Sequence, residues 1–167
     1  GRDLHRSVRG LGRCFYLTEP REAGGAASRG KHVGFVFQSC PLIPSLTAVE
    51  NVMWTLEIRG RRDARQVAVS ALAQVGLTPR LAHYPKQLSG GEQQRVAIAR
   101  AFVTHPAVLF ADEPTGNLDT ATGQRITDLL FDLNLSTGST LVLVTHDRAL
   151  AQRCNRVLEL DAGHTVN

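Results

Sequence analysis

Two stretches of the chain decide its fold. Residues 88–95 read Leu-Ser-Gly-Gly-Glu-Gln-Gln-Arg, and residues 108–119 read Val-Leu-Phe-Ala-Asp-Glu-Pro-Thr-Gly-Asn-Leu-Asp. The first stretch has the composition of a helix start, and the second has that of a strand end that carries carboxylates. Both also contain groups that suit a phosphate or a metal ion, so together they predict a nucleotide site.

The first stretch predicts a helix whose first turn exposes its backbone N–H groups. Ser89 and Glu92 have the S-x-x-E spacing of a capping box. Gly90 and Gly91 leave N–H groups uncovered at the positive end of the helix dipole, which attracts anions. Each glycine costs about 1 kcal/mol of helix stability relative to alanine, a cost that an ordinary capped helix does not need. We therefore favour phosphate contact here. The expected buried face of the helix comprises Val96, Ile98, Ala99, Phe102 and Val103.

The second stretch predicts a parallel strand with an acidic end. Residues 108–111 form a short apolar run, which is typical of a buried strand. Asp112 and Glu113 follow at its carboxyl end, where open α/β sheets place their ligands. One carboxylate would serve a Mg²⁺ ion and the other a water molecule. A lone acidic pair is more often a solvated strand end, but the turn residues after it and Asp119, a good helix cap, favour a site.

The rest of the chain alternates between strands and helices. A strand at 33–37 ends at Gln38, and Thr47 with Glu50 forms a second capping box that opens a helix ending at Gly60. A further helix is expected from about 62 to 75, before the helix at Ser89. The Asp112 strand is followed by a helix with apolar residues from Ile126 to Leu133, and then by a strand at 140–145. This order predicts a mostly parallel α/β sheet.

His146 directly follows the strand at 140–145, in the same topological position as Asp112 and Glu113. Because the carboxyl ends of adjacent parallel strands meet at one edge, we expect the three side chains at one rim. This position favours a functional role for His146. The other histidines are expected to be structural: His5, His32, His83, His105 and His164.

Composition excludes several classes. The 167 residues are long enough for one domain with a core, and no apolar run approaches the length of a membrane span. Three distant cysteines and scattered histidines indicate neither a disulfide framework nor a zinc site. Seven basic and three acidic side chains lie in residues 1–34, whereas residues 35–167 carry twelve of each. The main body therefore gives no reason to expect nucleic-acid binding.

From about His32 to the C-terminus the chain resembles an ABC transporter ATP-binding subunit. Residues 33–38 are similar to the strand and Q-loop, 88–95 to the signature, 108–113 to Walker B, 116–119 to the D-loop, and His146 to the H-loop. The resemblance implies a P-loop NTPase-like α/β fold, a mostly parallel sheet with an inserted helical subdomain. It divides residues 32–167 into a helical subdomain at 39–100 and a catalytic core at 101–167. The sequence of residues 111–119 most resembles the branch of the family that serves lipoprotein release, macrolide export and related export systems.

The resemblance also implies roles for individual residues. Catalysis would rest on Glu113, His146 and Gln38, and Mg²⁺ would be held by Asp112 and Gln38. ATP would lie between two subunits arranged head to tail, with a second ATPase subunit and an integral membrane permease as partners. The protein would be cytoplasmic, on the inner face of the membrane through its permease. The expected cofactor-binding residues are Ser89, Gly90, Gly91, Gln93, Asp112 and Asp119.

One part of the family pattern is not found. The near match to a P-loop at residues 25–32 has His32 where Mg²⁺ needs a hydroxyl, and Gln38 follows Lys31 too soon for a helix. We predict that the chain lacks its own P-loop, first strand and following helix. Residues 1–31 are then an atypical Gly/Arg-rich segment outside the family sequence, and a shifted reading frame or misplaced start is one explanation. Losing two or three charge-assisted hydrogen bonds would weaken ATP binding by on the order of 5 kcal/mol.

Three function classes follow. The leading one is the energy-coupling, ATP-hydrolysing subunit of an ABC exporter. The second is a degenerate or truncated partner that hydrolyses nothing and supplies only the signature half-site. The third is a soluble ABC ATPase of DNA repair or translation, which the short helical section disfavours. The transported substrate is not encoded in this chain.

Overall fold

The computed structural model describes residues 6–10, 13–17, 33–38, 41–161 and 164–166. The near match to a P-loop at residues 25–32 lies outside the described residues, and so does most of the segment 1–31. Among the described residues, no helix is long and apolar enough to cross a membrane.

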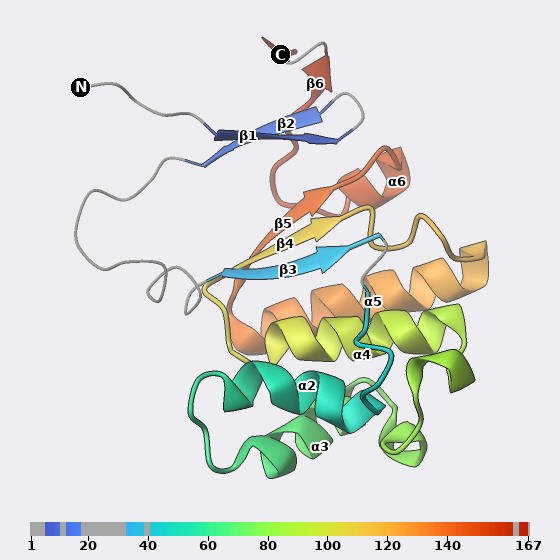
Figure 1. Cartoon of the computed structure of the whole chain (residues 1–167). Coiled ribbons are helices and arrows are strands. Elements are labelled where there is room, and N and C mark those ends of the chain that lie inside the picture. The colour runs from blue at the N-terminus through green and yellow to red at the C-terminus, as the bar shows by residue number, and fades with distance from the viewer. Residues whose placement is uncertain (1–5, 11–12, 18–32, 39–40, 162–163, 167) are drawn as a thin grey trace.

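A three-stranded parallel sheet forms the centre of the molecule. Its strands are β3 (Val33–Phe37), β4 (Val108–Asp112) and β5 (Thr140–Val144), in the order β3-β4-β5. The register sets Phe37 beside Asp112 and Asp112 beside Val144, so the three strands end level with one another. In Figure 1 the three arrowheads point the same way and end along one edge. The predicted parallel α/β sheet is confirmed.

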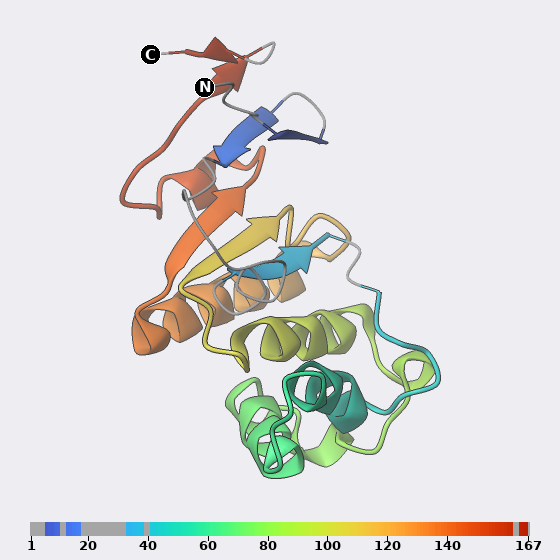
Figure 2. The same ribbon diagram turned by 60° about the vertical axis from the view of Figure 1, so that its left-hand side comes forward.

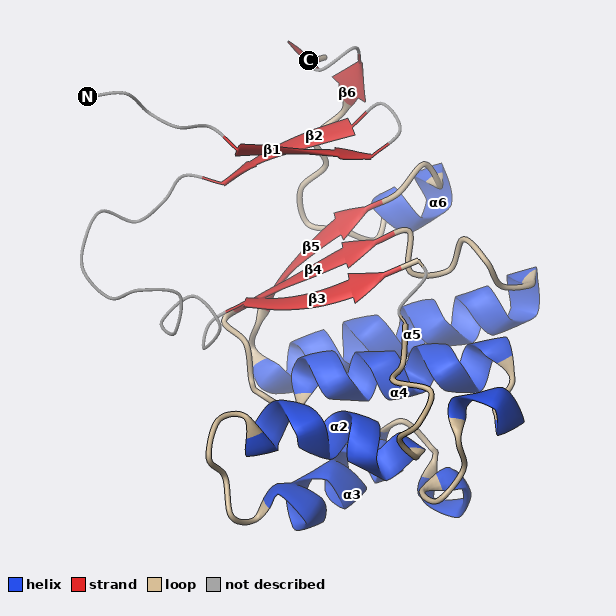
Figure 3. Ribbon diagram, viewed as in Figure 1, coloured by secondary structure: helices blue, strands red, loops and turns tan. Residues whose placement is uncertain are grey.

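Helices lie in two layers on one side of this sheet. The inner layer holds α4 (Gly90–Phe102) and α5 (Thr120–Thr137), and the outer layer holds α2 (Ala48–Glu57) and α3 (Ala64–Gln74) (Figure 3). Two short 3-10 turns, η1 (Thr78–Arg80) and η2 (Pro85–Gln87), connect α3 to α4. The short helix α6 (Arg148–Ala151) follows β5.

Two small antiparallel pairs complete the described structure. β1 (Arg6–Gly10) pairs with β2 (Arg13–Leu17), and β6 (Leu160–Asp161) pairs with β7 (His164–Thr165). Figure 2 shows both pairs on the far side of the parallel sheet from the helices. β1 and β2 were not predicted, because the first 34 residues hold seven of the fifteen glycines of the chain and show little periodicity.

Helix α4 is the centre of the hydrophobic core. Val96, Ala97 and Ile98 have no exposed surface, because α2 and α3 pack on one side of the helix and α5 and β3 on the other. Three consecutive buried residues occur in a helix only when it is covered nearly all round. The predicted face of this helix is confirmed, and it is wider than predicted because Ala97 and Ala101 are buried too.

The parallel sheet is covered on one face only within the described structure. Leu109 and Ala111 of β4 are fully buried, but Phe35 and Phe37 on the opposite face of β3 are about half exposed at 48% and 46%. Phe35 stacks on Phe37 and on Phe110, with ring centroids 5.8 and 5.5 Å apart. The strand predicted at 108–111 is therefore fully buried at Leu109 and Ala111 but only partly buried at Val108 and Phe110, since no described helix lies over these rings.

Helix α2 is held by its cap and by one buried amide. The predicted capping box is present: the Oγ1 atom of Thr47 accepts from the backbone N–H of Glu50, whose carboxylate accepts from the N–H of Thr47. Asn51 is fully buried and clamps the preceding loop. Its Oδ1 accepts from the N–H of Ile43, and its Nδ2 donates to the carbonyls of Ile43, Leu46 and Thr47. The side chain of Trp54, further along α2, is 49% exposed.

The substitution Asn51→Asp tests this clamp. It keeps the shape of the side chain but replaces the donor Nδ2 with an oxygen that faces three carbonyls, and it buries a charge. We expect the free energy of unfolding to fall by roughly 2 kcal/mol or more in urea denaturation at neutral pH. Asn155→Asp at an exposed position is the matched control, and an equal loss in both variants would contradict the clamp.

Candidate functional site

The carboxyl edge of the parallel sheet gathers the acidic and imidazole side chains that the sequence singled out. Asp112 ends β4, Glu113 follows it, Gln38 follows β3, and His146 lies two residues past β5. Because the strands end level, these residues share one rim. The predicted meeting of the strand ends is confirmed for Glu113 and His146, which are in direct contact.

Glu113 and His146 form a pair with two contacts to one oxygen. The Oε1 atom of Glu113 accepts from the backbone N–H of His146 at 2.9 Å and lies 2.6 Å from the ring Nδ1. An ionised carboxylate can only accept, so Nδ1 carries a proton in this arrangement. The side chain of Glu113 is 23% exposed and that of His146 is 80% exposed. The pair thus faces solvent with the Nε2 atom of the imidazole away from the carboxylate.

The backbone at Glu113 is strained. Its φ angle is +42°, in the left-handed region that non-glycine residues seldom adopt. Its N–H donates to the carbonyl of Val144 at 2.9 Å, and its carbonyl accepts from the N–H of Gly116 at 3.0 Å. These two bonds fix the turn after β4. Strain of this kind concentrates at functional sites, where it directs a side chain that ordinary geometry would turn away.

Gln38 is bonded to the loop after β4. Its Nε2 donates to the Oδ1 atom of Asn117 at 3.0 Å, and the Nδ2 of Asn117 donates to the Gln38 carbonyl at 3.4 Å. From the sequence, Asn117 was expected in the turn after the strand and, by the resemblance, in the D-loop, with no predicted contact to Gln38. Local patterns carry no signal for a contact between residues so far apart in the chain.

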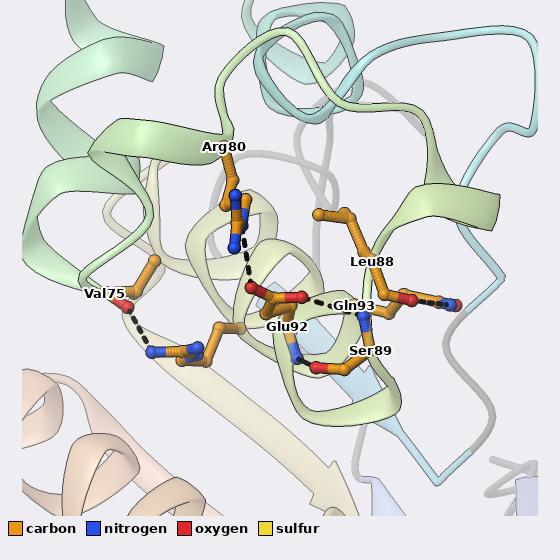
Figure 4. A network of polar contacts seen from close by, with 7 residues as sticks. Val75, Arg80, Leu88, Ser89, Glu92 and Gln93 are labelled. Atoms are coloured by element: carbon orange, nitrogen blue, oxygen red, sulfur yellow. Dashed lines mark hydrogen bonds and ion pairs between the residues drawn. The ribbon is translucent and has the colours of Figure 1, made fainter.

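The start of α4 has the predicted capping box. The Oγ atom of Ser89 accepts from the N–H of Glu92 at 3.3 Å, and the Glu92 carboxylate accepts from the N–H of Ser89 at 2.8 Å (Figure 4). Arg80 adds an ion pair to the same carboxylate at 3.0 Å. The hydrogen bond from the Ser89 backbone and then the Arg80 bond hold the pKa of Glu92 below its ordinary value. Ser89 and Gly90 are exposed, so the N-terminal end of the helix is accessible.

Gly91 has a packing reason to be glycine. A Cβ atom at this position would lie 2.6 Å from the Cγ2 of Thr122 on α5. At Gly90, by contrast, a Cβ would meet only Leu118 at an ordinary 3.6 Å. Both glycines were expected to expose backbone N–H groups to phosphate, but close packing of α4 on α5 already accounts for the second one.

Gln93 braces the loop before α4. Its Nε2 donates to the carbonyl of Pro85 at 3.1 Å. It also donates to the carbonyl of Leu88 at 3.0 Å (Figure 4). Both amide protons are thus directed to the chain's own backbone and not outward. The contact of Gln93 with a cofactor stays a prediction, and its observed position is that of a support for the loop that ends at Ser89.

Asp119 caps α5, as the sequence predicted. Its carboxylate accepts from the backbone N–H of Thr122 at 3.0 Å, and this bond is the main cause that lowers the pKa of Asp119. Among the described residues, no hydrogen bond joins the Ser89 group to the rim that holds Glu113 and His146. The start of α4 and the rim are therefore two parts of the site that no hydrogen bond connects within the described structure.

The rim has donors that suit a hard cation. Asp112 offers carboxylate oxygens and Gln38 an amide oxygen, the ligand types that Mg²⁺ takes together with water and phosphate. The described residues hold no group of three or more His, Cys, Asp or Glu side chains able to form a complete metal cage. The residues present fit an ion that shares its coordination with a bound phosphate.

Comparison with known proteins identifies the family. The family model described as "ABC transporter" matches residues 12–116, more than half of the chain. The chain belongs to the ABC transporter family. The chain is 59% identical over 144 residues to the uncharacterized ABC transporter ATP-binding protein YbbA of Escherichia coli (strain K12). The match covers 85% of this chain and 63% of that protein. It is 53% identical over 137 residues to the lipoprotein-releasing system ATP-binding protein LolD of Legionella pneumophila (strain Paris), covering 81% and 60%.

Solved ABC structures agree with this assignment. The dimeric post-hydrolysis state of the ATP-binding cassette MJ0796 bound to ADP and Pi matches with a TM-score of 0.73 and 43% identity. The match covers 84% of this chain and 63% of that one. The P-loop NTPase-like α/β fold expected from the resemblance is thus confirmed. The chain spans less than two thirds of the length of these ABC relatives.

Replacing Glu113 tests the backbone strain at this residue. Glu113→Gly and Glu113→Ala both remove the His146 contact, but only glycine adopts the left-handed backbone without strain. We expect the glycine variant to be more stable by about 0.5–1 kcal/mol in urea denaturation. At the exposed helical position Asp132 the order should reverse, since glycine weakens a helix. Equal stability of the two Glu113 variants would contradict the strain.

The lowered pKa of Glu92 predicts a pH dependence. Its stabilising contribution is present above the ordinary glutamate pKa and is lost as the pH falls through the lower pKa of the folded state. We expect the unfolding free energies of the wild type and Glu92→Gln to differ at about pH 6 and to converge as the pH falls through the lowered pKa of the folded state. Urea denaturation across this range measures it. A difference that does not shrink at low pH would contradict the role of the ionised carboxylate.

Proposed function

We propose that this chain belongs to the ATP-binding, energy-coupling subunit of an ABC-type exporter. The observation that carries the proposal is the Glu113–His146 contact at the sheet edge, beside Asp112 and Gln38. In an ABC chain this arrangement suits the hydrolysis of a nucleotide whose phosphates reach the rim. The identity to LolD and the 50% identity over 142 residues to the macrolide export ATP-binding/permease protein MacB of Rhodopirellula baltica support the exporter branch.

The rim residues have distinct proposed roles. Glu113 orients and polarises the attacking water, because a general base must lie within hydrogen-bond reach of the proton that it takes. His146 contacts the terminal phosphate through the ring nitrogen that Glu113 does not engage. Asp112 and Gln38 hold Mg²⁺, which neutralises charge on the phosphates.

The Ser89 surface serves a second nucleotide. Ser89 and Gly90 are exposed at the positive end of α4, and no hydrogen bond among the described residues connects them with the Glu113 rim. We propose that they bind the ATP of a partner subunit, with Gln93 and Asp119 holding the flanking loops in place. The dimeric MJ0796 cassette supports this arrangement of two chains. The permease would meet the helical subdomain near Gln38 on the inner face of the membrane.

A second candidate function is a partner that supplies only the signature half-site. It is favoured by the sequence, whose sole near match to a P-loop has His32 at the Mg²⁺ position. Such a chain would bind ATP poorly alone and would act on the nucleotide of an intact subunit. In the full-length protein, the absence of a thermal shift at millimolar ATP agrees with this function, and a micromolar dissociation constant contradicts it.

Glu113→Gln tests the leading function. In the full-length protein assembled with its permease, we expect ATP turnover to fall by about 100-fold or more, because a general base contributes about that factor. The affinity for ATP should stay within about twofold. A coupled phosphate-release assay and nucleotide titration measure the two quantities.

The matched control is Glu57→Gln, which changes an exposed carboxyl group at the end of α2. It should turn over ATP at the wild-type rate. Undiminished turnover in Glu113→Gln would remove the catalytic role from this residue.

A further inference from the structure

Gln38 and Asn117 hold each other through two hydrogen bonds that run in opposite directions. The Nε2 of Gln38 donates to the Oδ1 of Asn117 at 3.0 Å, and the Nδ2 of Asn117 donates to the backbone carbonyl of Gln38 at 3.4 Å. Gln38 follows β3, and Asn117 lies in the loop between β4 and α5. The two bonds therefore join the ends of neighbouring strands across the rim.

The chemistry of these bonds fixes the orientation of both amides. A backbone carbonyl can only accept, so Asn117 must present its NH₂ group to Gln38 and its oxygen to the Gln38 side chain. That oxygen can also only accept, so Gln38 must present its own NH₂ group to Asn117. The remaining end of the Gln38 amide is its oxygen, Oε1. One backbone carbonyl thus determines which end of Gln38 is left for a ligand.

Gly116 allows this arrangement by having no side chain. A Cβ atom there would lie 2.7 Å from the Nε2 of Gln38 and 2.9 Å from its Cδ. These distances are shorter than real carbon contacts, so any larger residue would push the amide aside. The loop at 116–117 therefore lies close against the Nε2 side of the Gln38 amide.

We propose that Asn117 is a positioning residue that directs the oxygen of Gln38 toward the nucleotide-bound Mg²⁺. This inference rests on the proposed function, because it gives Gln38 a metal to meet. An amide oxygen is a ligand for Mg²⁺, whereas the NH₂ end of a rotated amide cannot coordinate a cation. Asn117 itself does not touch the metal and acts only through Gln38.

The side-chain NH₂ signals of the 167-residue chain test the positioning without any nucleotide. We expect the Gln38 signal to show a nuclear Overhauser effect to Asn117 in the wild type, and its hydrogen exchange to accelerate roughly twofold to tenfold in Asn117→Leu. Asn117→Asp keeps an acceptor for Nε2 and should retain more protection than the leucine variant. Asn155→Leu, at an exposed position, should leave the Gln38 signal unchanged. A Gln38 signal that is the same in Asn117→Leu as in the wild type overturns the proposal.

The Mg²⁺ dependence of ATP turnover in the full-length protein tests whether the positioning of Gln38 affects metal binding. In Asn117→Leu the Mg²⁺ concentration for half-maximal turnover should rise roughly twofold to tenfold, with the maximal rate within about twofold. In a Gln38→Ala background the same substitution should have no further effect on that concentration, because the two residues act through one contact. A loss of maximal rate with unchanged Mg²⁺ dependence overturns the positioning role. Absence of turnover in the wild type would instead refute the proposed function, and the NMR result would still decide the positioning.

Discussion

The parallel register of β3, β4 and β5 is the constraint on which the site depends. Since Phe37, Asp112 and Val144 lie side by side, the residues that follow each strand emerge at the same level. Gln38, Glu113 and His146 come from segments far apart in the chain, and only this register brings them to one rim. A shift of one residue in any strand would turn its side chains to the opposite face and separate the pair that now shares a carboxylate oxygen.

Helix α4 links this rim to the second surface of the molecule. It is packed against α2 and α3 on one side and α5 and β3 on the other, so its N-terminal end has little freedom to move independently. Gly91 packs directly against Thr122, one turn into the helix that Asp119 caps. The exposed start of α4 and the loop that leaves β4 are therefore parts of one packed unit. Two surfaces that would serve different nucleotides are rigidly related through these contacts.

Much of this could be predicted from the sequence because its signals are local. The capping boxes at Thr47 and Ser89 depend on residues three positions apart. The strands that end at Asp112 and just before His146 were predicted from short apolar runs. The features that escaped prediction depend on distance in the chain or on the backbone. Gln38 and Asn117 are separated by 79 positions. The left-handed conformation of Glu113 and the close approach at Gly91 exist only after packing, and the clamp by Asn51 has no apolar signature.

The fluorescence of Trp54 reports on only one part of the molecule. Trp54 is the only tryptophan among the 167 residues and lies half exposed on α2, in the helical layer farthest from the parallel sheet. Intrinsic emission will therefore report on that outer layer, whereas far-ultraviolet circular dichroism averages over all helices and strands. If the two spectroscopic transitions coincide during denaturation, the helical layer and the sheet melt as one cooperative body. If emission changes first, the outer helices detach while the sheet edge that carries Glu113 and His146 is still folded.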